Sequence, residues 1–518
     1  MEKIEKKFLG IELGSTRIKA MLIDEGYSPA ATGTFDWESS YEDGFWTYSL
    51  DDAWSGIQSA YAKLAEEYRL KYGEELSMPD GLCISAMMHG YLAFDKDWEL
   101  LTPFRTWRNT TTEEAAAKLT ERFGFNIPQR WSIAHLYQAI LDSDPHVGRI
   151  SFITTLAGYV HRKLSGENVL GIGDASGMFP VDSHACGYDA TMADSFRSLT
   201  GIDIGSVFPK VLTAGRYAGE LTDEGARLLD PGGTLKPGVP MCPPEGDAGT
   251  GMVATNSIAA RTGNISAGTS VFAMVVLEKP LSGLYTEIDM VTTPAGLPVA
   301  MVHCNSCTSD LDAWVKIFGE AASLMGAEFS MDELYNALYS AALRGDPDGG
   351  GLMVCNYYTG EPITGFEQGR PLFARQPDSP VNLANFMRAS VYAAIATLSI
   401  GMDILTKRER INLDVMLGHG GFFKTPGAGQ KLMASALDVP VAVRSSAAEG
   451  GAWGAALLAA FAEGAGGKPL EQFLGNVFER SDTVIAEPDA DDTAGFKIFM
   501  DRYVRGLEIE RAAVKNLL

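Results

Sequence analysis

The stretch LGIELGSTRIKAMLID, residues 9–24, decides how this chain begins to fold. Two apolar runs flank the segment Gly14-Ser15-Thr16, and the second run, residues 18–23, alternates as a half-buried β-strand does. A glycine followed by hydroxyl residues is typical of a tight turn. We therefore predict a β-hairpin at the start of an α/β domain.

The hairpin pattern occurs a second time, about half a chain length later. ISAGTS, residues 265–270, repeats the order of IELGST, residues 11–16: an apolar strand, a glycine and two hydroxyl residues. A six-residue echo is weak support for an internal duplication when taken alone. It suggests two related domains that open with the same hairpin, and we place them at residues 1–254 and 255–518.

Length and composition agree with this organisation. A chain of 518 residues is too long for one hydrophobic core, and two large α/β domains account for it. Hydrophobic residues make up 46% and charged residues 21%, which is the balance of a folded globular protein rather than a disordered one.

The charge and the cysteines bear on partners and compartment. The net charge is −24, and proteins that wrap nucleic acid or coat an anionic membrane need a basic field, so the sequence predicts neither partner. We find no run of about 18 apolar residues and no signal peptide, and six cysteines are few, so we expect a cytoplasmic protein. Cys304 and Cys307 form one C-x-x-C pair without a second pair, which favours structural thiols over zinc; a redox role stays open.

Glycine is over-represented, with 56 of 518 positions against an average near 7%. It permits close backbone approach, and successive amides in such turns form a nest for anions. Three turns are candidates for holding phosphate groups: Gly14-Ser15-Thr16, Gly268-Thr269-Ser270 and Gly418-His419-Gly420-Gly421. Ordinary connecting turns are the alternative for each. Neither the dinucleotide pattern nor the P-loop pattern opens a helix after a strand.

Two carboxylates belong to this set of glycine-rich segments. Asp247, in EGDAGTG, stands at a predicted helix start, where a carboxylate can take a proton from a hydroxyl that attacks a phosphoryl group. Its alternative role is to cap that helix. Glu12 lies in an apolar strand, where an acid should not be buried unpaired, and it could hold Mg²⁺ directly or through water. Its alternative is a solvent-facing strand position.

Three residues are candidates for contact with a small substrate. Met88 and His89 follow a short apolar strand, and polar residues at strand ends tend to line crevices in α/β folds. Asp174 lies in the loop GIGDASG, residues 171–177. The alternatives are a structural histidine and a turn residue. Five aromatic residues could stack on a sugar, or pack under a loop, which is the commoner arrangement. They are Trp37, Phe45, Trp46, Tyr48 and Trp54.

Seven segments, in this order along nearly the whole chain, resemble the FGGY carbohydrate kinases, and within them the xylulokinase-like pentulose kinases. They are LGIELGSTRIKAMLID, ISAMMHGYLAFD, EGDAGTGMV, ISAGTS, NYYTGE, ANFMRA, and LGHGGFFK with EGGAWGAALLA. No single segment is decisive, but seven in the right order are highly specific.

The resemblance implies a fold and a set of site residues. The fold would be two actin-like, RNase H-type α/β domains with the active site in a cleft between them. Asp247 would be the general base and a Mg²⁺ ligand together with Glu12, and the sugar would contact Met88, His89, Asp174 and Asp247. The ATP phosphates would lie against Gly14, Ser15, Thr16, Lys19, Gly268, Thr269 and Ser270, and adenosine near Gly420, Gly421 and Phe422.

The chain departs from the family pattern at three places. The family usually has Asp where Glu12 stands, and the extra methylene puts direct Mg²⁺ coordination in doubt. The Trp-Asn-Asp stretch of xylulokinases is here Trp107-Arg108-Asn109-Thr110, and the Glu-Gln-Asp-Pro element expected after Gly44 is replaced by residues 47–50. The first of these differences bears on which sugar is bound, and the second on either a sugar contact or a hinge contact.

We therefore expect an ATP-dependent kinase that converts a ketopentose, D-xylulose first, to its 5-phosphate. L-ribulose is the second choice, because epimer specificity rests on a few hydrogen bonds that the sequence does not place. A non-catalytic ATP-dependent switch of the actin or Hsp70 type is the alternative from another class. The sequence says little about assembly, and a homodimer is the default expectation.

Overall fold

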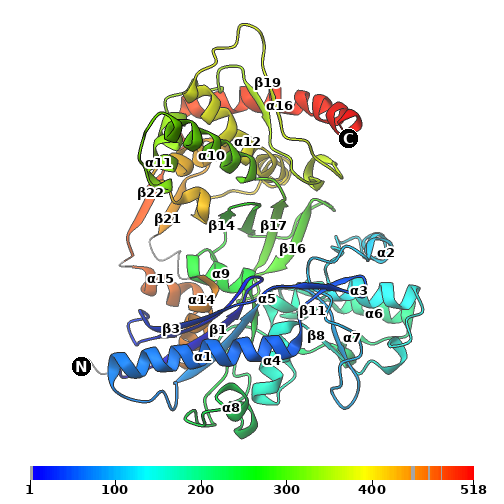
Figure 1. The fold of residues 1–518 in the computed structure, drawn as a ribbon. Helices are drawn as coiled ribbons and strands as arrows, with labels where there is room; N and C mark the ends of the chain where they lie inside the picture. The colour runs from blue at the N-terminus through cyan, green and yellow to red at the C-terminus, as the bar shows by residue number, and fades with distance from the viewer. Residues whose placement is uncertain (1–3, 445–449, 465–466, 480, 518) are drawn as a thin grey trace. The chain divides into compact units, whose positions relative to one another are not determined.

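The computed structural model describes residues 4–444, 450–464, 467–479 and 481–517. The chain divides into two compact units, which are described one at a time (Figure 1). The first consists of Met1–Ile258, Asp289–Val299 and Glu449–Arg480, and the second of Ala259–Ile288, Ala300–Ala448 and Ser481–Leu518. Two segments from the second half of the sequence therefore belong to the first unit.

The first unit is built on a five-stranded sheet with the strand order β13-β6-β1-β2-β3. The predicted hairpin is confirmed as β1 and β2, which are antiparallel and place Glu12 opposite Lys19. β1 also pairs in parallel with β6, and β6 in parallel with β13. The strand bounds are β1 Phe8–Leu13, β2 Arg17–Ile23, β3 Pro29–Asp36, β6 Gly81–Ala86 and β13 Glu245–Gly246.

Two helices cover the opposite faces of this sheet. Helix α1 (Leu50–Tyr72) packs on β2 and β3, with Ser49 as its N-cap and Gly73 in the left-handed conformation at its end. Helix α14 (Gly450–Gly464) packs on β1 and β6 (Figure 1). A Cβ at Gly33 would overlap the backbone of α1, and one at Gly10 the backbone of α14. Glycine therefore lets each helix approach the sheet closely.

The remaining elements of the first unit are short. Helix α9 begins directly after β13, and α5 directly after β9, so each carries a residue from a strand end into a helix. The bounds are β4 Ser40–Glu42, β5 Phe45–Thr47, β7 Leu92–Phe94, α2 Glu113–Phe123, α3 Ser132–Leu141, η1 Val147–Arg149, β8 Phe152–Thr154, α4 Leu156–Ser165, β9 Val169–Gly171, α5 Ile172–Ala175, β10 Val181–Asp182, β11 Gly187–Tyr188, α6 Ala190–Thr200, α7 Ile204–Val207, β12 Lys210–Leu212, α8 Asp223–Leu229, α9 Asp247–Thr255 and α15 Leu470–Phe478.

The second unit repeats the strand arrangement of the first. The strands β21-β20-β14-β15-β17 are neighbours in this order, as β13-β6-β1-β2-β3 are in the first unit. β14 and β15 form an antiparallel hairpin, β14 pairs in parallel with β20, and β20 in parallel with β21. The bounds are β14 Thr262–Ala267, β15 Val271–Val276, β17 Pro298–Cys304, β20 Val415–His419, β21 Val441–Arg444 and β22 Thr483–Ala486; β16 (Ile288–Thr292) falls mostly in the segment Asp289–Val299 of the first unit. The sequence echo thus marks a repeat of topology.

A long buried helix forms the core of the second unit. Among the described residues, the segment Leu383–Arg408 is the one helix long and apolar enough to cross a membrane, yet 83% of its apolar window is buried inside the protein. Arg388 lies within it and pairs with Asp492, so the helix is a core element. The bounds in this unit are α10 Ser309–Leu324, α11 Met331–Ala342, β18 Met353–Cys355, η2 Pro362–Thr364, β19 Leu372–Ala374, α12 Leu383–Asp403, η3 Ile404–Arg408, η4 Gly421–Phe423, α13 Ala428–Leu437 and α16 Ala490–Asn516.

Candidate active site

Four carboxyl groups gather near the carboxyl ends of the parallel strands β1, β6 and β13 in the first unit. This edge of a sheet is where open α/β folds bind their ligands. Burial raises the pKa of all four, and Asp247 further raises the pKa of two of them by its charge. The four are Glu12 on β1, Asp174 on α5, Glu245 on β13 and Asp247 on α9.

Asp247 is the first residue of α9, and its carboxylate is anchored by backbone amides. Oδ1 accepts hydrogen bonds from the amide of Met88 at 3.1 Å and from that of Ala248 at 2.8 Å. Gly246 occupies the N-cap position and Asp247 is the next residue, so the bond from the amide of Ala248 to Asp247 also stabilises the first turn of α9. Burial raises its pKa, against the lowering effect of the amides of Met88 and Ala248, which makes it a stronger base than an exposed carboxylate.

Glu12 reaches from β1 to the first turn of α14. Its Oε2 accepts a hydrogen bond from the amide of Ala452 at 3.0 Å, which does not fit the alternative of a solvent-facing strand position. Burial, and then the charge of Asp247, raise the pKa of Glu12 to about 7, while the amide of Ala452 and the charge of Lys19 lower it. A Cβ at Gly451 would overlap Glu12, so the glycine makes room for this longer side chain.

Asp174 is fully buried on the short helix α5. The hydroxyl of Thr155 donates to its Oδ2 at 2.6 Å, whereas its Oδ1 is buried and has no hydrogen-bond partner in the described part of the chain. Burial raises the pKa of Asp174 to about 8, and the charge of Asp247 adds to this. A buried acceptor without a partner is costly, so this oxygen is suited to receive a donor from a ligand.

Met88 and His89 lie against the segment that carries Asp174. The Nδ1 atom of His89 is 3.2 Å from the carbonyl oxygen of Gly177, and its ring stacks on Trp131 with a centroid distance of 6.4 Å. A Cβ at Gly177 would overlap Nδ1 of His89 and approach the methyl group of Met88 closely. These are the contacts of a packed histidine, and they also bring the two predicted sugar-binding segments together.

The turn of the first hairpin is braced by two aromatic residues. The indole N–H of Trp37 donates to the carbonyl oxygen of Gly14 at 2.7 Å, and the hydroxyl of Tyr48 donates to that of Ser15 at 2.6 Å. The two rings pack at 4.3 Å between centroids. Packing under a loop is therefore what these two aromatics do, and the loop is the predicted phosphate turn. Thr16 completes that turn, and Lys19 lies on β2 opposite Glu12.

The predicted nucleotide residues of the second unit also lie close together. Parallel pairing of β14 with β20 brings the turn Gly268–Ser270 next to the segment that follows His419. A Cβ at Gly420, whose φ is 98°, would overlap the carbonyl of Ala267, so only glycine fits this contact. Thr269 and Ser270 belong to the turn, and a Cβ added at Gly268 or Gly421 would meet no atom within 4 Å.

Phe422 differs from its neighbours because its side chain is fully buried. It packs against the rings of Tyr339 and Phe423, with centroid distances of 6.0 and 5.3 Å. A nucleotide could meet the backbone at this position, but not the ring.

The C-x-x-C pair lies next to the second turn. The amides of Cys307 and Thr308 donate to the carbonyl oxygens of Thr269 and Gly268, at 3.1 and 3.0 Å. Burial raises the pKa of the thiols of Cys304 and Cys307. Buried thiols of high pKa react poorly, which agrees with a structural rather than a redox role.

The altered segment 107–110 contacts Trp46, the residue directly before the altered segment 47–50. The side chain of Asn109 accepts from the amide of Trp46 at 2.8 Å and donates to its carbonyl at 2.9 Å. The guanidinium of Arg108 lies over the Trp46 ring at 3.7 Å, and its N–H donates to Ser39 at 2.7 Å. The altered segment 107–110 is therefore held against β5, which leads into the altered residues 47–50.

Sequence reasoning missed Glu245 and Thr250. The hydroxyl of Thr250 is 2.8 Å from that of Ser85, which ties α9 to β6. Glu245 is buried beside Asp174, and the signal that could have found it is a charged residue placed directly before a glycine in an otherwise apolar strand end.

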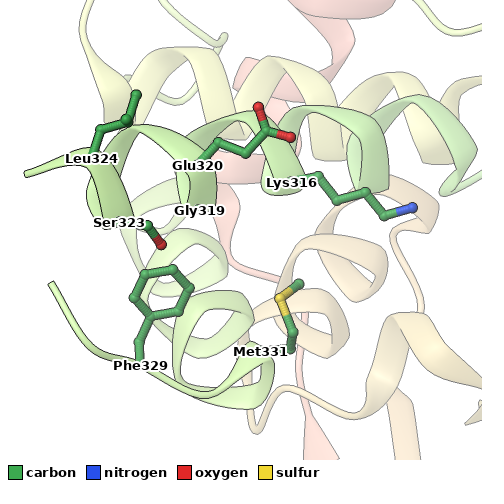
Figure 2. Close-up of a pocket in the computed structure, with 7 residues that line it drawn as sticks. All are labelled: Lys316, Gly319, Glu320, Ser323, Leu324, Phe329 and Met331. Carbon is green, nitrogen blue, oxygen red and sulfur yellow. The ribbon is translucent and has the colours of Figure 1, made fainter. Parts of the chain in front are cut away.

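A separate cavity of about 640 Å³ opens between α10 and α11 in the second unit (Figure 2). None of the predicted site residues lines it. Its walls are formed by Lys316, Gly319, Glu320, Ser323, Leu324, Phe329 and Met331.

The fold and the candidate site together indicate the class of protein to which this chain belongs. Two sheets of the same strand order, each an antiparallel hairpin extended by parallel strands, form the two halves of an actin-like α/β protein. Sequence models of the FGGY family of carbohydrate kinases match residues 7–253 with the N-terminal domain and residues 263–463 with the C-terminal domain. This chain belongs to the FGGY family and is a carbohydrate kinase.

Relatives within the family are distant. The xylulose kinase of Lactococcus lactis is 20% identical over 470 residues, which cover 88% of this chain and 87% of that protein. The match to the Bacillus subtilis xylulose kinase is 25% identical over 119 residues and spans 23% of either protein. Two solved structures from Lactobacillus acidophilus, a ligand-bound xylulose kinase and a gluconate kinase, are equally similar: TM-score 0.79, 16% identity and 99% coverage of both chains. At this identity the likeness concerns the fold, and the substrate is a separate question.

Proposed function

We propose that this kinase transfers the γ-phosphoryl group of ATP to a ketopentose, with D-xylulose to D-xylulose 5-phosphate as the first choice. The observation that carries the proposal is the position of Asp247. Its carboxylate is fixed at a helix start by the amide of Met88, beside His89 and the unsatisfied oxygen of Asp174. A base next to groups able to bind a polyol is what hydroxyl phosphorylation requires.

In this proposal Asp247 accepts the proton of the terminal hydroxyl group of the sugar. The freed oxygen forms a bond to the γ-phosphorus as the bond from that phosphorus to the bridging oxygen breaks, which yields the sugar phosphate and ADP. Asp174 and His89 orient the sugar, and Asp174 Oδ1 gains the hydrogen bond that it lacks. Bound ATP supplies the phosphoryl group.

The residues proposed to hold ATP fit an anionic ligand. The space that a Cβ would fill at Gly268 and at Gly421 is open, and the Gly14-Ser15-Thr16 turn offers amides and hydroxyls near Lys19. Mg²⁺ is usually held by one or two carboxylates together with phosphate oxygens, and Glu12 and Asp247 are the carboxylates that would hold it. Glu12 and Asp247 repel each other, and a divalent cation beside them would relieve that repulsion.

A sugar panel tests the proposal. Purified kinase with MgATP is assayed for ADP production with D-xylulose, L-ribulose, D-ribulose, D-gluconate and glycerol at equal concentrations. We expect the highest kcat/KM with a pentulose, D-xylulose before L-ribulose. Highest turnover with gluconate or glycerol would overturn the pentulose assignment. ATP binding without ADP production from any sugar would favour the actin-type or Hsp70-type switch.

A further inference from the structure

Glu245 is the one member of the carboxyl cluster without a role in the proposed reaction. It is 1% exposed, lies on the edge strand β13, and pairs in register with Ser85. Burial, followed by the charge of Asp174, raises its pKa to about 8, while the amides of Gly173, Asp174 and Gly246 lower it. Burying an acid costs free energy unless the acid makes specific hydrogen bonds.

Both carboxylate oxygens of Glu245 are bound to the segment that carries Asp174. Oε1 accepts from the amide of Gly173 at 3.3 Å, and Oε2 accepts from the amide of Asp174 itself at 2.9 Å. The same two segments are joined again by the amide of Gly171, at the end of β9, which donates to the carbonyl of Pro244, directly before β13, at 2.8 Å. Glu245 therefore fixes the backbone of Asp174 through hydrogen bonds to two successive amides.

The glycines of both segments are shaped around this carboxylate. A Cβ at Gly171 would overlap Oε1, and a Cβ at Gly173 would overlap Oε2. A Cβ at Gly246 would crowd Met88 and the free Oδ1 of Asp174, so the residue between Glu245 and Asp247 also borders the proposed sugar site. The segments G-I-G-D, residues 171–174, and E-G-D, residues 245–247, thus pack closely against each other.

We propose that Glu245 is the positioning residue of the sugar site: it holds the backbone of Asp174 at a set distance from Asp247, which lies two residues further along the chain, at the start of α9. The carboxylate of Glu245 is hydrogen-bonded to the backbone of α5, and the chain continues from Glu245 through Gly246 to Asp247, the proposed base. The orientation of Oδ1 of Asp174 toward the sugar therefore depends on Glu245, whose hydrogen bonds in the described part of the chain go to the segment of Asp174 and not to the phosphate turns. This inference rests on the proposed function.

The decisive variant is Glu245→Gln, which keeps the size of the side chain but replaces one acceptor oxygen by an NH₂ group that cannot accept from an amide. We expect the KM for the sugar to rise about tenfold or more, because a buried bond to the Asp174 backbone is lost. The KM for ATP and the sugar-independent ADP production should change less than about twofold. Glu121→Gln, an exposed site on α2, is the matched control and should behave as the wild type.

Gly173→Ala is an independent test because it disturbs the contact between Glu245 and α5 by a change on α5 and leaves Glu245 itself unchanged. The new methyl group would overlap Oε2 of Glu245, so we expect a loss of kcat/KM for the sugar in the wild-type background. The same substitution should cost much less in Glu245→Ala, where the space is empty. This variant pair also decides the matter if Glu245→Gln does not fold.

The outcomes separate this inference from the proposed function. A wild type that phosphorylates no pentulose overturns the function; amide hydrogen exchange at residues 173–174, faster in Glu245→Gln than in Glu121→Gln, would still support the contact. An active wild type with an unchanged sugar KM in Glu245→Gln overturns the role of Glu245 alone. Equal increases in the KM values for sugar and ATP, with a lower Tm, would make Glu245 a general structural residue and also overturn it.

Discussion

At the scale of single residues, the site is a set of acids whose environments differ. Asp247 accepts hydrogen bonds from two backbone amides, and Glu12 accepts one from an amide of α14. Asp174 accepts one from a hydroxyl, and its other oxygen has no partner among the described residues. Groups of the same type in different surroundings can take different roles, since burial and neighbours set their pKa values apart. The extra methylene of Glu12, compared with the usual Asp, is what brings its carboxylate to α14.

The first prediction concerns the base. Asp247→Asn keeps the shape and can still accept from Met88, but it cannot take up a proton. We expect kcat to fall about 10²- to 10⁴-fold, the contribution typical of a positioned general base, while ATP binding measured by calorimetry stays within about twofold. Asp97→Asn, an exposed position, is the control. Substantial phosphoryl transfer by Asp247→Asn would remove Asp247 from the base role.

At the scale of elements, the β1–β2 hairpin depends on parts of the chain that lie outside it. Its turn is held by Trp37, which follows β3, and by Tyr48, which follows β5. Tyr48 belongs to the segment 47–50, where this sequence departs from the family pattern. The altered segment therefore contributes a hydrogen bond to the Gly14-Ser15-Thr16 turn. A hairpin that binds phosphate gains from such bracing because its amides are then already in place.

The second prediction follows from this bracing. Tyr48→Phe removes the hydroxyl bond to Ser15 and leaves the ring contact with Trp37 intact. One such bond contributes about 1 kcal/mol, which corresponds to roughly a fivefold increase in the KM for ATP. Steady-state kinetics with varied ATP measures it, with Tyr41→Phe, an exposed tyrosine, as the control. An unchanged KM for ATP together with a raised KM for sugar would assign Tyr48 to the sugar instead.

At the scale of the whole molecule, the two sheets share one strand order, but the compact units are not simple halves of the sequence. The first unit takes in α14 and α15 from near the C-terminus and the segment 289–299. Helix α14 is almost entirely apolar and buried, and it covers the face of the sheet that carries Gly10. The division into domains of residues 1–254 and 255–518 stays a prediction.

The third prediction tests the composition of the first unit. A fragment of residues 1–254 lacks α14 and would expose the apolar face of β1 and β6 to water, so we expect it to aggregate or to unfold without a cooperative transition in urea. The full-length protein is the control and should unfold cooperatively. A soluble fragment with a sharp transition would show that the first 254 residues fold without α14.

The sequence by itself determined the two hairpins, their echo and the family, because these depend on local alternation, on glycine turns and on motif order. It also singled out Asp247, Asp174 and Glu12 by their chemistry. Only the tertiary structure decided how these acids are held: Glu245 bonded to the backbone of Asp174, Ala452 to Glu12, and the aromatics beneath the first turn. These contacts join residues as much as 440 positions apart in the chain. No local pattern encodes such pairings, because they arise when strands and helices pack and their buried polar groups must find partners.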